Sequence, residues 1–227
     1  MSDQKEKLET IKKLREMTGV GFSDCKSAIE ETGGDIDKAV EFLRKKGIAK
    51  ASKKMSRTAN EGLVLVHKEN NGVSLLEVNS ETDFVAKNKD FINFCEEALK
   101  VAVDTSSEEN LLDEVSERME KQRMALVQKI GENIIIRKVK KITGEVLDSY
   151  IHSNKKIAAG VSLEQGSPEI AKDVAMHIAA SNPIVLSPED LDESYINSER
   201  EIFKVSAIAR ILSSTDNLRN TEDSWGR

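Results

Sequence analysis

Two neighbouring residues, Asp83 and Phe84, are the best candidates for function in this sequence. They lie in the stretch 82–88, TDFVAKN, where a predicted hairpin gives way to a predicted helix. Connections between elements are usually polar, and side chains that a rigid scaffold presents there are often functional. An exposed ring beside a carboxylate could act on a partner as a wedge and a charge. The alternative is that Ser80 or Thr82 caps a turn, Asp83 begins the helix and Phe84 packs inward.

No motif for catalysis or metal binding accompanies this pair. The sequence contains no Walker loop, HExxH motif, Cys/His metal spacing or nucleophile constellation. The two cysteines, Cys25 and Cys95, form no metal or redox spacing, which fits a reducing cytoplasm. We therefore predict a cytoplasmic protein that is not an enzyme and needs no cofactor or metal.

The elements that must position Asp83 and Phe84 form a hairpin followed by helices. Strands rich in Val and Leu flank the turn residues Asn70, Asn71 and Gly72. The predicted elements are strands over 62–67 and 73–79, helices over 89–103 and 111–130, and a third strand over 133–142. Together they define a first core subdomain over 61–142, which carries the TDFV motif.

The same pattern then recurs more weakly. Strands over 146–152 and 157–163 flank a polar turn, and a helix follows over 168–181. This order of hairpin and helix suggests an internal duplication and a second core subdomain over 143–186. Two similar subdomains of this kind predict an α+β fold.

Three short helices are predicted before the first hairpin. The first has its apolar stripe at Leu8, Ile11, Leu14 and Met17. Ser23 is the expected N-cap of the second helix, and Asp35 that of the third, which we expect to end before Gly47. Residues 1–48 would then form a compact three-helix module of the ubiquitin-associated type.

A basic segment follows this module. Seven basic residues and one acidic residue lie within 41–57, and we predict a linker with some helical tendency over 49–60. It could bind an acidic partner or RNA, but no aromatic residues are interleaved to stack on bases, so a solvated connector is favoured. The net charge of −6 also argues against general nucleic-acid binding. The longest apolar runs are far shorter than the ~20 residues that span a bilayer, so we predict no membrane association.

A heptad seam occupies the carboxyl-terminal part. Ser187 and Pro188 predict a helix start, and apolar residues with one serine follow at steps of four and three: Leu191, Tyr195, Ser198, Ile202, Val205, Ala209 and Leu212. This pattern predicts a coiled-coil arm over 187–212, the first arm of a helical hairpin, with a polar tail over 213–227. Because the seam has no partner within the chain, we expect residues 191–212 to self-associate or to be poorly ordered.

Several stretches resemble one known family. They are 14–21 (LREMTGVG) with Asp24-Cys25-Lys26 and Gly33-Gly34-Asp35, 77–88 (EVNSETDFVAKN), 130–134 (IGENI) and 176–183 (MHIAASNP). In this order they resemble the bacterial translation elongation factor Ts family, and the resemblance runs from about residue 5 to about residue 205.

The resemblance implies a guanine-nucleotide exchange factor for elongation factor Tu, which would bind both GDP-bound and nucleotide-free Tu. Thr82, Asp83, Phe84 and Val85 would enter the GTPase domain of Tu near its Mg²⁺ site, Phe84 as a wedge and Asp83 by disturbing the groups that hold Mg²⁺. The module over 1–48 would also bind Tu. Lys26 and His177 match further motifs as additional contacts, although a packed histidine is an alternative for His177.

The carboxyl end departs from the family pattern. The resemblance fades after about Ala207, whereas typical members continue through a return helix, more sheet and a terminal module. We therefore expect a chain that lacks the usual carboxyl-terminal part and an incomplete second subdomain. The alternative function is a Tu-binding protein with reduced exchange activity.

Overall fold

The computed structural model describes the backbone of residues 2–69, 71–106 and 109–222. Side chains are described from Glu6 to Ile208, except at 48, 50–53, 70, 107 and 108. The chain divides into two compact units, Met1–Ser181 and Asn182–Arg227. Helices and small antiparallel sheets are mixed in the first unit, which confirms the predicted α+β class.

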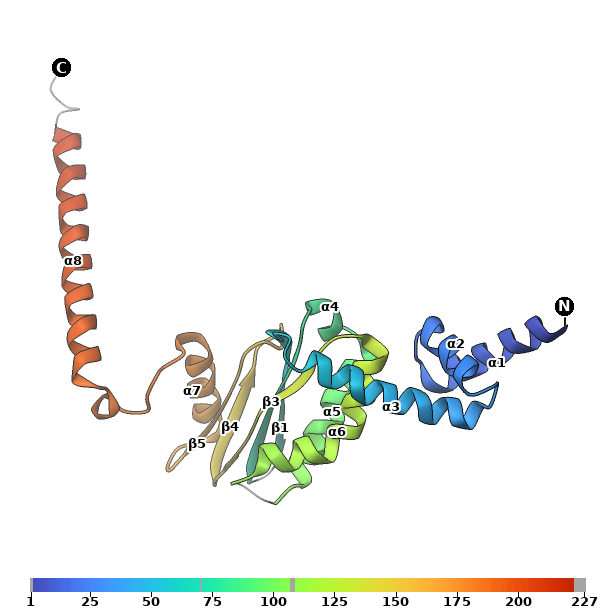
Figure 1. Ribbon diagram of the computed structural model, residues 1–227. Helices are drawn as coiled ribbons and strands as arrows, with labels where there is room; N and C mark the ends of the chain where they lie inside the picture. The colour runs from blue at the N-terminus through green and yellow to red at the C-terminus, as the bar shows by residue number, and fades with distance from the viewer. Residues whose placement is uncertain (1, 70, 107–108, 223–227) are drawn as a thin grey trace. The chain divides into compact units, whose positions relative to one another are not determined.

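Three helices open the chain: α1 (Ser2–Thr18), α2 (Phe22–Glu31) and α3 (Ile36–Lys54) (Figure 1). Their shared core contains Ile11, Leu14, Val20, Cys25, Ala28, Ile29, Ala39 and Leu43. Asp35 caps α3 as predicted, because its Oδ1 accepts a hydrogen bond of 3.0 Å from the Lys38 N–H. The predicted cap at Ser23 is wrong, since α2 already begins at Phe22 and Gly21 is its N-cap. Leu8 and Met17 of the predicted stripe are exposed.

Helix α3 does not end before Gly47 but continues to Lys54, into the segment predicted as a basic linker. A Cβ at Gly47 would lie 2.2 Å from Oε1 of Gln128 on α6 (Leu111–Ile130). The same glutamine donates a hydrogen bond of 2.8 Å to the Leu43 carbonyl. Gly47 therefore permits the close approach of α3 to α6, and it is a packing glycine rather than a helix stop.

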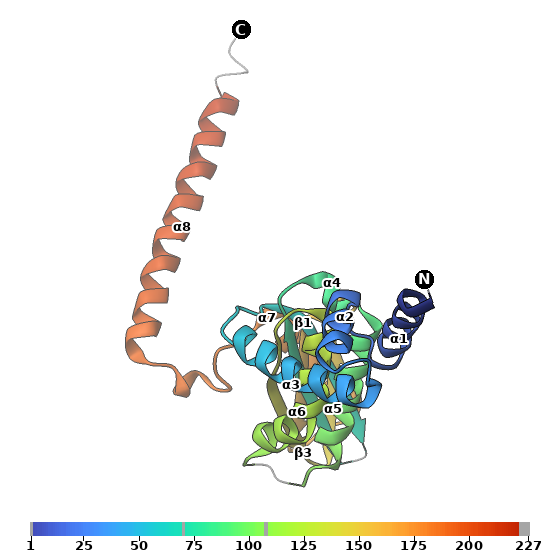
Figure 2. The ribbon, with the colours of Figure 1, turned by 45° about the vertical axis from the view of Figure 1, so that its right-hand side comes forward.

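A three-stranded antiparallel sheet forms the centre of the first unit. Its strands are β1 (Glu61–Glu69), β2 (Gly72–Ser80) and β3 (Ile134–Thr143), in the order β1-β2-β3. Helices α5 (Lys89–Asp104) and α6 cover one face of the sheet (Figure 2). Phe91, Val115, Met119 and Ile134 are almost fully buried in this layer. Strand β2 leads directly into the stretch that carries Asp83 and Phe84.

A bulge at Arg137 changes the side-chain alternation of β3. The register pairs Val78 with Ile136 but Glu77 with Lys138, so Arg137 has no direct partner on β2. Ile134 and Ile136 are buried two residues apart, and Val139 follows after three. The extra residue allows the strand to keep its apolar side chains on the helical layer on both sides of the bulge.

The second hairpin consists of β4 (Val146–Ile151) and β5 (Ala158–Leu163), and α7 (Pro168–Ser181) packs against it. The hairpin also contacts the central sheet, because a Cβ at Gly160 on β5 would lie 2.9 Å from Ile142 and 3.1 Å from Leu75. The Val64 N–H donates to the Lys155 carbonyl at 2.8 Å. Both faces of the central sheet are therefore covered, one by helices and the other by this hairpin.

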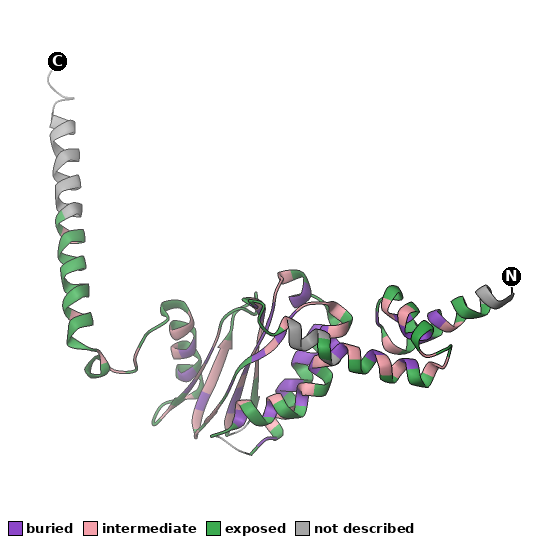
Figure 3. Cartoon of the chain, viewed as in Figure 1, coloured by how far each residue is buried: buried purple, intermediate pink, exposed green. Residues whose placement is uncertain are grey.

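The described residues of the second unit, 182–222, form the 3-10 turn η1 (Pro188–Asp190) and the helix α8 (Glu193–Glu222). The helix predicted to start at Ser187 begins later, because Leu191 is extended and Asp192 accepts a hydrogen bond of 2.7 Å from the Ser194 N–H. Residues 193–208 of α8 are almost all exposed (Figure 3). They include Tyr195, Ile202 and Val205 of the predicted seam; Ala209 and Leu212 lie outside the described side chains. Within the described residues, no helix has the length and apolarity needed to cross a membrane.

Candidate functional site

The stretch after β2 forms a single helical turn, α4 (Asp83–Ala86), between the sheet and α5. Phe84 is 80% exposed, whereas Val85 is 7% exposed and Ala86 is similarly buried. Two buried side chains therefore attach this turn to the core, and the aromatic ring between them and β2 points to solvent. The alternative that Phe84 packs inward is wrong.

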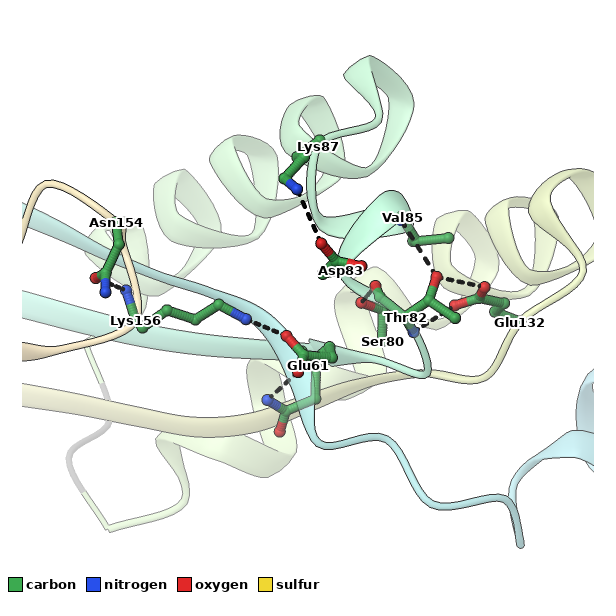
Figure 4. Close-up of polar contacts among 10 residues, drawn as sticks. Glu61, Ser80, Thr82, Asp83, Val85, Lys87, Glu132, Asn154 and Lys156 are labelled. Carbon is green, nitrogen blue, oxygen red and sulfur yellow. Dashed lines mark hydrogen bonds and ion pairs between the residues drawn. The ribbon is translucent and has the colours of Figure 1, made fainter.

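Thr82 is the N-cap of α4 and is held from a distant part of the chain. Its side-chain oxygen accepts a hydrogen bond of 3.5 Å from the Val85 N–H. Its own N–H and hydroxyl donate to the two carboxylate oxygens of Glu132, at 2.9 and 2.7 Å (Figure 4). Ser80 adds a hydrogen bond of 3.0 Å to the Thr82 carbonyl.

Asp83 is only partly exposed and has a charged partner. Its Oδ2 lies 2.8 Å from Nζ of Lys87, one helical turn further along. The hydrogen bond and charge of Lys87 hold the pKa of Asp83 below its ordinary value of 3.8, and Lys156 acts more weakly in the same direction. Asp83 is therefore a carboxylate at neutral pH, and Lys87 competes for it with any incoming cation.

The turn of the second hairpin reaches the same surface. Lys156 forms an ion pair with Glu61 at the start of β1, close to Asp83 in Figure 4. The Lys156 N–H donates to Asn154 Oδ1 at 2.9 Å, which holds the tight turn. Phe84 is thus an apolar side chain among paired charges, an arrangement suited to insertion into a partner protein rather than to bond-making chemistry.

The predicted site residues divide between one cluster and two separate helices. Thr82, Asp83 and Phe84 are together on α4 and its cap, whereas Val85 is buried and has little surface left for a direct contact. Lys26 lies on the exposed side of α2 and His177 on the exposed side of α7. The alternative of a packed His177 is therefore wrong.

Glu132 is the residue of this site that sequence reasoning did not identify. It belongs to the noted IGENI motif, but nothing in the spacing links it to Thr82, fifty residues earlier. Among the residues that the structure describes, no three or more His, Cys, Asp or Glu side chains cluster so that they could hold a metal ion. Cys25 and Cys95 are buried free thiols, and burial raises the pKa of Cys95 to about 12.

Comparison with known proteins gives a consistent result. The family model described as Elongation factor TS matches residues 81–215. Elongation factor Ts of Teredinibacter turnerae is 49% identical over 199 residues, which cover 86% of this chain and 68% of the relative. The corresponding protein of Marinobacter nauticus is 46% identical over 196 residues (86% and 68%), and that of Clostridium kluyveri is 42% identical over 216 residues (88% and 71%). This chain therefore belongs to the elongation factor Ts family.

Proposed function

We propose that this protein is a guanine-nucleotide exchange factor for elongation factor Tu and acts in translation elongation in the cytoplasm. The observation that carries the proposal is the exposed ring of Phe84 on a turn whose two following residues are buried. Ordered apolar side chains of this kind form the anchors of protein interfaces. Family membership supplies the partner.

In this proposal Phe84 inserts beside the nucleotide pocket of Tu, and Asp83 disturbs the groups that hold Mg²⁺. Mg²⁺ and the phosphate-binding backbone hold GDP together, so displacing either one loosens the nucleotide. The free energy of the contact between the two proteins offsets this loss. By linkage, bound GDP weakens the association of this protein with Tu by the same factor.

Two further surfaces belong to the same proposal. We propose that α1–α3 form a module of the ubiquitin-associated type, and that this module and α7 add contacts to Tu through Lys26 and His177. The exposure of both side chains supports this assignment. No direct contact with nucleic acid is required.

We also propose that α8 pairs with α8 of a second copy. Most of its described apolar side chains are exposed, including Tyr195, Ile202 and Val205. The segment 188–201 has six acidic residues and one basic residue, whereas 202–222 has three basic and two acidic residues. An antiparallel pair would place these unlike segments side by side.

Release of labelled GDP from Tu tests the exchange function. The intact protein should accelerate release, and Phe84→Ala should lower the maximal rate by about 30-fold, the loss of an aromatic anchor worth about 2 kcal/mol. The matched control is Leu186→Ala, which removes a fully exposed apolar side chain between α7 and η1 and should leave the rate within about threefold.

GDP release and a separate measurement of binding to Tu distinguish the two candidate functions and test the mechanism. Binding to Tu without faster release would support a Tu-binding protein with reduced exchange activity. Normal acceleration by the double variant Phe84→Ala, Asp83→Ala would contradict the proposed mechanism.

A further inference from the structure

The turn between α6 and β3, residues 131–133, contacts two earlier segments of the chain. One precedes it by about fifty residues and the other by more than seventy. On one side Glu132 binds Thr82 through two hydrogen bonds of 2.9 and 2.7 Å. On the other, Nδ2 of Asn133 donates 2.8 Å to the Arg57 carbonyl, and Lys54 at the end of α3 donates to the Gly131 carbonyl. One short turn thus holds both the base of α4 and the end of α3.

Helix α4 cannot fix its own geometry. It has only four residues, and a single turn is unfavourable in isolation because nucleation orders several residues for one hydrogen bond. The buried side chains of Val85 and Ala86 restrain its far side. Its start depends on Thr82, whose hydroxyl donates to Glu132 while its oxygen lone pair accepts from the Val85 N–H.

Glu132 determines the direction of that hydroxyl. Oε1 of Glu132 accepts the hydrogen bond from the Thr82 hydroxyl, so a lone pair of that hydroxyl is left for the Val85 N–H. The neighbouring chain is fixed as well, because Oε1 of Glu81 accepts 2.6 Å from the Asn133 N–H and Oε2 lies 3.6 Å from Arg57. The carboxylates of Glu132 and Glu81 therefore both link the chain around Thr82 to the turn 131–133.

We propose that Glu132 is a positioning residue for nucleotide exchange, which fixes the direction of Phe84 and Asp83 through Thr82 without touching the partner. This inference rests on the proposed exchange function. Misplacement of a functional group by about 1 Å can lower a rate about 100-fold, so loosening of α4 should affect the rate more than the affinity.

The first test compares Glu132→Ala, Glu132→Gln and Thr82→Val in labelled-GDP release from Tu. Glu132→Ala should lower the maximal rate at saturation by about tenfold or more, with less than a threefold change in the half-saturating concentration. Glu132→Gln keeps one carbonyl acceptor and should recover most of the rate. The double variant Thr82→Val, Glu132→Ala should be no slower than the slower single variant, since both remove the same contact. Glu145→Ala, at the exposed turn after β3, is the matched control.

The second test uses the free protein and needs no exchange activity. Hydrogen exchange of the Val85 amide should be at least tenfold faster in Glu132→Ala, with the Phe94 amide in α5 unchanged. The positioning role would be overturned if the Val85 amide kept its protection in Glu132→Ala. It would also be overturned if this variant changed only the half-saturating concentration and left the maximal rate unaltered. Failure of the unaltered protein to accelerate GDP release would overturn the proposed function instead, while the amide measurement would still decide the role of Glu132.

Discussion

Phe84 and Val85 are neighbours in the chain with opposite environments. The ring of Phe84 is in solvent, whereas Val85 contributes to the core between the sheet and α5. The sequence identified the TDFV motif because its composition is unusual for a connection, but it did not separate the residue that is presented from the residue that holds it. That distinction depends on which side of a single turn faces the core.

The difference predicts opposite effects on stability. Phe84→Ala should change the free energy of unfolding by no more than about 0.5 kcal/mol, because an exposed ring loses few contacts on truncation. Val85→Ala should cost about 1–3 kcal/mol, since it removes buried methyl groups and leaves a cavity. Urea denaturation of the two variants measures both values, and equal losses would contradict the orientation of α4.

Asp83 gives a prediction on pH. Its pKa lies below 3.8 in the folded protein because Lys87 favours the carboxylate. The pair therefore supports α4 above the ordinary pKa, and this support is lost as the pH falls through the lowered value. Lys87→Met should raise the pKa of Asp83 back towards 3.8, measured by NMR titration of its carboxyl carbon. Lys89→Met, at the exposed start of α5, should leave it unchanged; an equal effect of both variants would rule out the specific pair.

At the scale of elements, local signals predicted most boundaries within two residues. The helices over 111–130 and 168–181 agree with α6 and α7, because apolar periodicity and the adjacent glycine or proline are local. Two predicted helix boundaries were wrong, one because of a contact distant in sequence and the other because a second residue caps the helix. Gly47 looked like a helix end but accommodates Gln128, and Pro188 starts only one turn because Asp192 caps the next helix.

The packing of α3 on α6 predicts that Gly47→Ala has opposite effects on stability with and without the Gln128 side chain. Gly47→Ala should destabilise the protein, since its Cβ would displace Gln128 and break the hydrogen bond to Leu43. In a Gln128→Ala background the same change should stabilise by about 0.5–1 kcal/mol, because alanine is the better helix former. Urea denaturation of the four proteins of this cycle gives the coupling. Additive effects would show that Gly47 is not required for the approach of the two helices.

At the scale of the whole molecule, the sequence predicted the order of the parts but not what covers the central sheet. Val73 and Ile142 look like ordinary strand residues, and only the structure shows that the second hairpin packs on their side through Gly160. Pairing between strands can be predicted from turns and alternation. The packing of one sheet on another depends on shape complementarity between segments far apart in the chain.

Self-association through α8 is the prediction at this scale. Sedimentation velocity should show a dimer that dissociates on dilution, and the double variant Ile202→Asp, Val205→Asp should be a monomer, because it places charges in the proposed seam. Asn197→Asp lies off the seam and should leave the dimer intact. A monomer at all concentrations for the unaltered protein would contradict the pairing.

The bulge at Arg137 determines which changes of length β3 can tolerate. Because the central sheet is covered on both faces, removing or adding one residue elsewhere in the strand would turn the side chains beyond that point to the wrong layer. Removal of either Arg137 or Lys138 would leave Ile134, Ile136 and Val139 in regular alternation on the helical layer. Removing Arg137 would also remove the hydrogen bonds of its side chain to Asn79 and Ala59. Among related proteins, single-residue gaps in this strand should therefore occur at positions 137 and 138 and not elsewhere in it.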